Sequence, residues 1–315
     1  MAKNAKISLV APGTIKAPDT EDYNALVEIM TNHLRANINH VLPDKPDLIV
    51  VPEACDRFPN LPMEKRKEYY QVRGDRIRDF YRDIAREHNC YIAYSACRNT
   101  PWDEKFPYRN STQIIGRDGE IVGIYDKNHL VISENTNGGI AYGKEAKTFD
   151  LDFGSVACAI CFDLNFEELL LKYIPQKPKL IIFSSMYHGG LSQEYWAYRC
   201  RSYFAGAICG LPSRVLNPFG ETVATSTNYY SYCTAKVNFD YSIPHIDHNN
   251  VKFKDIKKKY GDAVTIHDPG YIGCVMMTCN AEDMCIEDVL REFEIELMDD
   301  YFDRSTAHRN ANLEY

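Results

Sequence analysis

The sequence predicts an α/β domain, followed by a polar segment at the C-terminus. Two observations favour this fold class. First, the order strand, helix, strand, helix, strand, hairpin occurs twice between residues 7 and 226, without a repeat in the sequence itself. Second, several predicted strands are short, nearly continuous apolar runs, which is typical of strands that are buried on both faces of a sheet.

The first half of the domain alternates between the two types of element. Residues 7–12 and 47–52 are apolar runs and predict strands, as does 90–98. Residues 21–40 carry apolar residues at helical spacing, and 64–88 predict one long, charged amphipathic helix.

The second half repeats this order. Strands are predicted at 153–161, 179–185 and 207–214, with helices at 166–174 and 193–204 between them. Each half ends in a turn between extended segments.

The two turns have recognisable signals. In the first half, the Arg-Asp-Gly sequence at 117–119 predicts a tight turn within a hairpin that covers 111–127. In the second half, Gly220 marks a turn within 217–226.

The C-terminal part differs in composition, so we divide the chain into a domain at 1–240 and an extension at 241–315. The extension contains a basic run at 252–259, which we interpret as a solvated face. An acidic helix is predicted from Asn280, with that residue as its N-cap. The extension packs either on its own domain or against a neighbouring subunit, and the sequence leaves both open.

Composition excludes several classes of protein. The formal net charge is −8 and the pI about 5.6, which argues against a general nucleic-acid binder. The N-terminus lacks the apolar segment of a signal peptide, and no apolar run is long enough to span a membrane. We therefore expect a cytoplasmic protein, without a membrane partner, whose eleven cysteines are reduced.

Neither a metal nor a nucleotide cofactor is predicted. Cys158 and Cys161 have the spacing of a metal-binding or redox pair, but a strand directs them to opposite faces. His245, Asp247 and His248 could ligate a metal, yet a polar loop explains them better. The sequence contains no glycine-rich phosphate loop.

Three chemically complementary residues stand where predicted strands end. Glu53 follows the strand at 47–52, Lys127 ends the first hairpin, and Cys161 ends the first strand of the second half. Glu53 could take the thiol proton as Cys161 attacks a carbonyl or nitrile carbon. The Lys127 ammonium and the backbone N–H of Phe162 could then stabilise the negative oxygen that forms.

Each of these residues also has an ordinary structural explanation. Glu53 alone could be a loop carboxylate, Lys127 a solvated lysine, and Cys161 a packed core residue. Their combination at matched strand ends favours catalysis, because strand ends are where α/β proteins build active sites.

The same segments resemble the carbon–nitrogen hydrolase (nitrilase) superfamily over residues 7 to about 240. The resemblance rests on DLIVVPE at 47–53, GIYDKNHL at 123–130 and CAICFDLNF at 158–166. It implies a four-layer α-β-β-α sandwich, a Glu53–Lys127–Cys161 triad, and hydrolysis of non-peptide C–N bonds through a thioester or thioimidate. It also implies a homo-oligomer built on a dimer.

The resemblance also bears on the residues that would position or bind the substrate. Glu134 matches a second glutamate of the family, which would position the substrate or the lysine; a loop carboxylate is the alternative. Many relatives have two further sequence patterns, which are absent from this chain at 165–168 and 199–206. The first of these patterns contains an arginine that can hold a substrate carboxylate, so a different residue would have to do so here. Tyr187 and His188 follow a predicted strand and should border the substrate, although a structural role is equally plausible.

Taken together, the sequence predicts a cysteine hydrolase that cleaves a small amide or N-carbamoyl compound without a cofactor. Nitrile hydrolysis and acyl transfer to an amine use the same triad and stay open, as does a catalytically silent scaffold. The loops that would set specificity are 55–62, 98–110, 132–145 and 187–194, whose structure the sequence pattern does not predict.

Overall fold

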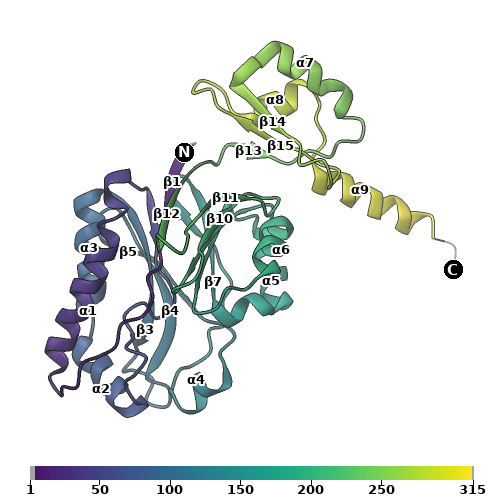
Figure 1. Cartoon of the computed structure of the whole chain (residues 1–315). Helices are drawn as coiled ribbons and strands as arrows, with labels where there is room; N and C mark the ends of the chain where they lie inside the picture. Colours follow the sequence, from purple (N-terminus) through teal and green to yellow (C-terminus); the bar gives the residue numbers. More distant parts are fainter. Residues whose placement is uncertain (1–3, 314–315) are drawn as a thin grey trace. The chain divides into compact units, whose positions relative to one another are not determined.

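The computed structural model describes residues 4–313, which form two compact units (Figure 1). One unit spans Ala5–Val237, and the other comprises Asn4 together with residues 238–313. The first unit contains every residue that the sequence predicts to be catalytic.

The first unit contains two sheets, each with six strands among the described residues. The first sheet has the order β12-β1-β2-β3-β4-β5, in which β1, β2 and β3 run parallel and β3, β4 and β5 are antiparallel. Its strands are β1 (Asn4–Val10), β2 (Leu48–Val50), β3 (Tyr91–Asn99), β4 (Tyr108–Ile115), β5 (Ile121–Asp126) and β12 (Tyr232–Asn238).

The second sheet repeats this arrangement in the order β11-β10-β9-β8-β7-β6. Its central strands β7, β8 and β9 are parallel, whereas β6, β10 and β11 join in antiparallel fashion. The strands are β6 (Phe149–Leu151), β7 (Gly154–Ile160), β8 (Leu180–Ser185), β9 (Tyr203–Ile208), β10 (Arg214–Leu216) and β11 (Thr222–Thr225).

The two sheets lie face to face and helices cover their outer faces (Figure 1). A hydrogen bond of 2.8 Å from Ser184 Oγ to the Val51 carbonyl links the sheets near the ends of their central strands. The first sheet is covered by α1 (Tyr23–Ile38), α2 (Met63–Arg73) and α3 (Arg76–His88), and the second by α5 (Glu167–Tyr173) and α6 (Leu191–Cys200). The predicted α-β-β-α sandwich is therefore confirmed.

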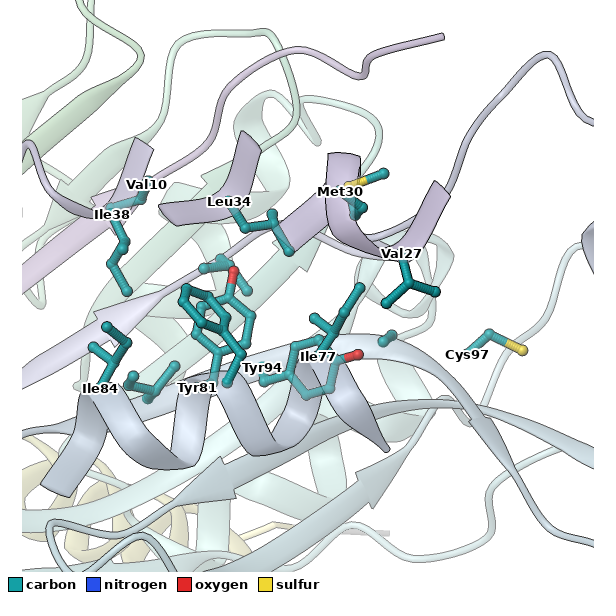
Figure 2. Close-up of a cluster of buried hydrophobic side chains, with 14 of the residues drawn as sticks. Val10, Val27, Met30, Leu34, Ile38, Ile77, Tyr81, Ile84, Tyr94 and Cys97 are labelled. Carbon is teal, nitrogen blue, oxygen red and sulfur yellow. The ribbon is translucent and has the colours of Figure 1, made fainter. Parts of the chain in front are cut away.

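The helices on the first sheet are fixed by a core between α1, α3 and that sheet (Figure 2). Leu34 and Ile38 of α1 face Tyr81 and Ile84 of α3, and all four are buried. The helix α1 begins at Tyr23, within the predicted segment 21–40, because the Asp22 carboxylate caps its first turn by accepting two backbone N–H groups.

Several predicted boundaries are wrong, including the end of the strand predicted at 207–214, which stops at Ile208. The segment 64–88 is two helices rather than one, because Gly74 takes a φ of +50° and ends α2. The helix predicted at 193–204 ends at Cys200, where Arg201 adopts a left-handed conformation, and the following strand begins at Tyr203 instead of 207.

The second unit has a sheet and a core of its own. Its three strands have the order β13-β15-β14, and buried side chains from the sheet and helices include Ile256, Val264, Met277 and Ile286. Its elements are β13 (Tyr241–Ser242), α7 (Asn250–Tyr260), β14 (Val264–His267), β15 (Met276–Cys279), α8 (Ile286–Glu292) and α9 (Met298–Ala311). Packing against a neighbouring subunit stays a prediction.

The sequence predicted that the acidic helix of this unit begins at Asn280. That prediction is wrong. The Asn280 amide instead donates to the Asp262 carbonyl and to Thr265 Oγ1. The helix α8 starts only at Ile286, after Cys285, whose N–H donates to the Asp288 carboxylate. Tertiary hydrogen bonds thus override the local capping signal.

The residues that the structure describes include neither a membrane-spanning helix nor a cluster of metal ligands. Across residues 4–313, no helix combines the length and the apolar character needed to cross a bilayer. In the same range, no three His, Cys, Asp or Glu side chains gather as a metal site. The His245 ring stacks on Tyr301 at 4.1 Å between centroids.

The core between α1 and α3 predicts a difference between two substitutions on one helix. Leu34 is 4% exposed and Ile29 is 38% exposed. We expect Leu34→Ala to lower the free energy of unfolding by about 2–5 kcal/mol, since it leaves a cavity. Ile29→Ala should change it by no more than about 1 kcal/mol. Urea unfolding of the full chain measures both, and equal losses would contradict this account of the core.

Candidate active site

The active-site candidates lie at the ends of strands from both sheets. Glu53 follows β2, Lys127 follows β5 and Cys161 follows β7. Glu53 and Lys127 are buried, with 4% and 1% of their surface exposed, and Cys161 is half-buried. The structure therefore brings the three residues to one place between the sheets, although 108 positions separate Glu53 from Cys161 in the sequence (161 − 53).

The Lys127 ammonium is the centre of this group. Its Nζ lies 2.8 Å from Glu53 Oε1 and 2.8 Å from Glu134 Oε2. Burial lowers the pKa of Lys127, but the charges of Glu53 and Glu134 outweigh burial and raise the pKa above its usual value. The lysine is thus a permanent cation at neutral pH, even though it has almost no contact with solvent.

Asn110 completes the network, and sequence reasoning missed it. Its Nδ2 donates to Glu53 Oε1 at 2.8 Å and to Glu134 Oε1 at 2.9 Å. Asn110 lies on β4 and is buried. No local signal marks it, because an asparagine in a strand becomes informative only when its two partners are known.

Glu134 reaches the network from the short helix α4 (Ile132–Thr136). Its Oε2 accepts the backbone N–H of Val131 at 2.8 Å, as a glutamate in the first turn of a helix commonly does. The helix start therefore fixes the carboxylate that holds Lys127. This placement agrees with the role that the family resemblance implies for Glu134.

Cys161 occupies a strained backbone position. Its φ is +48°, which is costly for a residue with a Cβ, by about 1–3 kcal/mol. The chain turns sharply there, because β7 ends at Ile160 and the 3₁₀-helix η2 (Cys161–Asn165) begins at once. The turn presents the thiol at the strand end instead of packing it within the sheet.

Asp163 holds this turn in place and connects it to the lysine segment. Its carboxylate is fully buried and accepts the N–H of Ile160 at 3.0 Å and the Tyr125 hydroxyl at 2.8 Å. The backbone N–H of His129 also donates to it, at 2.7 Å. One carboxylate therefore joins the residues that flank Cys161 to those that flank Lys127.

The His129 side chain strengthens this connection. Its Nδ1 lies 3.2 Å from Asp163, its Nε2 lies 3.0 Å from Glu168, and its ring stacks on Phe166 at 3.9 Å. The hydrogen bond to Asp163 is the largest cause that raises the pKa of His129. His129 and Asp163 occur in the segments that carry the family resemblance, yet the sequence alone assigned no role to either residue.

The Cys161 thiol lies within electrostatic reach of both charged residues. Burial and the Glu53 charge together raise its pKa to about 11, whereas Lys127 and the backbone N–H of Met186 act in the opposite direction. A hydrogen bond with the Glu53 side chain also raises the thiol pKa. The sulfur is therefore protonated at neutral pH, with a carboxylate beside it that can accept the proton.

Three further residues were predicted to contribute to the site, namely Phe162, Tyr187 and His188, and they do not all lie near the thiol. The N–H of Phe162 belongs to the first turn of η2, where a helix provides no acceptor of its own. Burial raises the pKa of Tyr187 and the Cys161 charge adds to this effect, so the phenol lies near the thiol. His188 lies beside Arg214 and Glu194 instead; burial lowers its pKa and the Arg214 charge lowers it further.

A cavity adjoins the network on the side of Asn110 and Glu134. Its free volume is about 60 Å³, which is far smaller than a typical ligand site. Its walls come from the segment after Glu53, from α2, β3 and β4, and from the segment that contains α4. They include Arg57, Arg66, Lys67, Tyr70, Asn110 and Glu134. Two of the loops that we expected to set specificity, 55–62 and 132–145, contribute to these walls.

Comparison with known proteins agrees with this arrangement. A family model described as "Carbon-nitrogen hydrolase" matches residues 7–237. The chain belongs to the carbon–nitrogen hydrolase family. The resemblance inferred from the three sequence segments is thereby confirmed, and with it the assignment of the protein as an enzyme of this class.

Individual relatives of this carbon–nitrogen hydrolase are distant. Deaminated glutathione amidase of Bos taurus is 23% identical over 221 residues, which cover 62% of this chain and 67% of the relative. The structure of the NitFhit protein of C. elegans has a TM-score of 0.61 at 19% identity, covering 83% of this chain and 66% of that one.

A further solved structure carries a chemical observation in its description. It is an amidase from Nesterenkonia sp. with a TM-score of 0.60 and 14% identity, covering 81% of this chain and 97% of that one. It is described as showing covalent addition of the acetamide moiety of fluoroacetamide at the active-site cysteine. At this identity the likeness shows a shared fold.

The electrostatics of the carbon–nitrogen hydrolase site predict how the thiol titrates. Because the Glu53 charge raises the pKa of Cys161, we expect Glu53→Gln to lower that pKa from its value of about 11. The ultraviolet absorbance of the thiolate, taken as the difference between each protein and its Cys161→Ala counterpart, reports the titration. Glu28→Gln on the exposed face of α1 is the matched control. An unchanged or higher pKa in Glu53→Gln would show that the two side chains are not coupled.

Proposed function

We propose that the protein is a cysteine amidohydrolase, which cleaves a small amide or N-carbamoyl compound through a thioester on Cys161. The observation that carries this proposal is the contact between Lys127 and Glu53, buried next to a protonated thiol. In such a group, the carboxylate can deprotonate the thiol, and the cation can stabilise the oxyanion that forms when the sulfur attacks.

In the first step, Glu53 accepts the thiol proton while the Cys161 sulfur forms a bond to the amide carbon. Glu53 accepts two hydrogen bonds in this network, from the Lys127 ammonium and from the Asn110 amide, and both go to Oε1. Its Oε2 is thereby left for the thiol. The carbonyl electron pair moves to the oxygen, which becomes negative. The Lys127 ammonium and the Phe162 N–H are the donors that we assign to this oxyanion.

In the second step, the tetrahedral intermediate collapses and the C–N bond breaks. The protonated Glu53 returns its proton to the leaving nitrogen, so that ammonia or an amine departs and a thioester stays on Cys161. Water then attacks the thioester and gives a proton to Glu53. When the C–S bond breaks, Glu53 passes that proton to the sulfur and the carboxylic acid leaves.

This cycle requires that Lys127 keep its charge throughout. The two carboxylates around it provide that condition, since each raises the pKa of the lysine. Glu134 also holds the ammonium in place when Glu53 becomes protonated and loses its negative charge. Loss of one oxyanion donor typically costs about 3 kcal/mol of transition-state stabilisation.

The choice of an amide over a nitrile rests on the relatives. Two of the three proteins compared above are named as amidases, although the sequence identities are low. Nitrile hydrolysis would proceed through a thioimidate, and acyl transfer would replace water by an amine. Both begin with the same attack by Cys161, so the triad by itself does not separate them.

The proposal predicts opposite results for the two cysteines of the CAIC segment. We expect Cys161→Ala to abolish release of ammonia from small amides, because the nucleophile is lost. Cys158→Ala should retain it, since Cys158 is fully buried within β7. Glu53→Gln should lower the rate by about 10²–10⁴ through loss of the general base.

A panel of amides, carbamoyl amino acids and nitriles provides the substrates for this test, with released ammonia as the measurement. Mass spectrometry of the intact protein should detect an acyl adduct on Cys161 in wild type and none in Cys161→Ala. Equal ammonia release by wild type and Cys161→Ala would refute the proposal.

A further inference from the structure

A buried ion pair lies three residues after the general base and has no part in the proposed cycle. Asp56 is fully buried and Arg73 is 2% exposed, and Arg73 Nη1 lies 2.8 Å from Asp56 Oδ2. Removing two charges from water offsets much of their attraction, so a buried pair is weak evidence for a gain in stability. The presence of this pair therefore needs a different explanation.

The ion pair connects separate parts of the first unit. Arg73 is the last residue of α2, and its Nη2 donates to the Cys97 carbonyl at 2.5 Å. The Tyr94 hydroxyl donates to Asp56 Oδ2 at 2.7 Å. Since Tyr94 and Cys97 both belong to β3, the Asp56 carboxylate is held from α2 and from β3 at once.

Asp56 also closes the turn that begins with Glu53. Residues 53–56 form this turn, which follows β2. Ala54 within it has a φ of +46°, a left-handed conformation that is costly for a residue with a Cβ. Such a conformation persists only when its surroundings hold it in place. The bound side chain of Asp56 is one such hold, on the C-terminal side of Ala54.

The turn also bears on the second carboxylate oxygen of Glu53. The hydrogen bonds from Lys127 and Asn110 both go to Oε1 and fix that oxygen alone. For Oε2 to meet the Cys161 thiol, the backbone of Glu53 must be fixed as well. Geometry matters for this step, because a misplacement of about 1 Å can lower a rate by about 10²-fold.

We propose that Asp56 and Arg73 are positioning residues, which hold the turn at 53–56 so that Glu53 can accept the Cys161 proton. This inference rests on the proposed amidohydrolase function. Both residues are buried away from the substrate and act only through Glu53. Loss of the pair should therefore lower kcat and leave KM nearly unchanged.

An apolar replacement of the pair separates positioning from structural support. The double variant Asp56→Leu/Arg73→Met removes one charge of each sign, and buried pairs often tolerate such a replacement. The substrate is the amide of the panel above that wild type hydrolyses fastest. We expect kcat to fall by about 10- to 100-fold and KM to change by less than about threefold.

Titration of the Cys161 thiol gives a second readout, which needs no substrate. Because the Glu53 charge raises the thiol pKa, a Glu53 that is no longer held beside the sulfur should raise it less. We therefore expect a lower thiol pKa in the double variant than in wild type. Thiolate absorbance, taken as the difference from each Cys161→Ala counterpart, measures it. A purely structural role of the pair would leave this pKa unchanged.

Two further variants complete the test. Arg73→Lys keeps the charge but loses the paired donors, so its kcat and thiol pKa should lie between those of wild type and the double variant. Arg117→Lys makes the same change in an ion pair with Asp47, at the other end of β2, and should match wild type. Should the double variant fail to fold, as judged by circular dichroism, wild-type values in Arg73→Lys would overturn the proposal.

The outcomes separate this inference from the proposed function. A folded double variant with the kcat and the thiol pKa of wild type would show that the pair is structural only, and a rise in KM at unchanged kcat would also reject the positioning role. If wild type releases no ammonia from any amide, the proposed function fails, whereas a lowered thiol pKa in the double variant still supports the positioning of Glu53. Ammonia release by wild type, together with an unaltered thiol pKa in the double variant, would do the reverse.

Discussion

The buried contact of Lys127 with two carboxylates is the constraint on which the rest of the site depends. Removing charged groups from water costs several kcal/mol for each ion, so such a cluster persists only when every member is paired. Here Lys127 binds Glu53 and Glu134, and Asn110 donates to both carboxylates. The ends of β2 and β5, the strand β4 and the start of α4 must therefore meet at one point, which links the fold directly to the chemistry.

The state of the thiol follows from this arrangement. Many cysteine enzymes lower the pKa of their nucleophile with an adjacent cationic histidine. In this chain, burial and the Glu53 charge raise the pKa of Cys161 to about 11, and His129 is instead held by Asp163, Glu168 and Phe166. The thiol proton must then leave during the attack itself, and Glu53 is the acceptor beside it. Lys127 serves this step best as a fixed positive charge, since its raised pKa keeps its protons bound at neutral pH.

The sequence was most informative where a local pattern and a functional residue coincide. Glu53, Lys127 and Cys161 each stand where a predicted strand ends, and the three segments resemble those of one family, so the sequence predicted that these residues would meet. Asn110, Asp163 and His129 could not be predicted in this way, because their roles arise from contacts across 24 to 57 positions of sequence. The breaks at Gly74 and Arg201 were missed for a related reason: helical periodicity continues through a residue whose backbone conformation ends the helix.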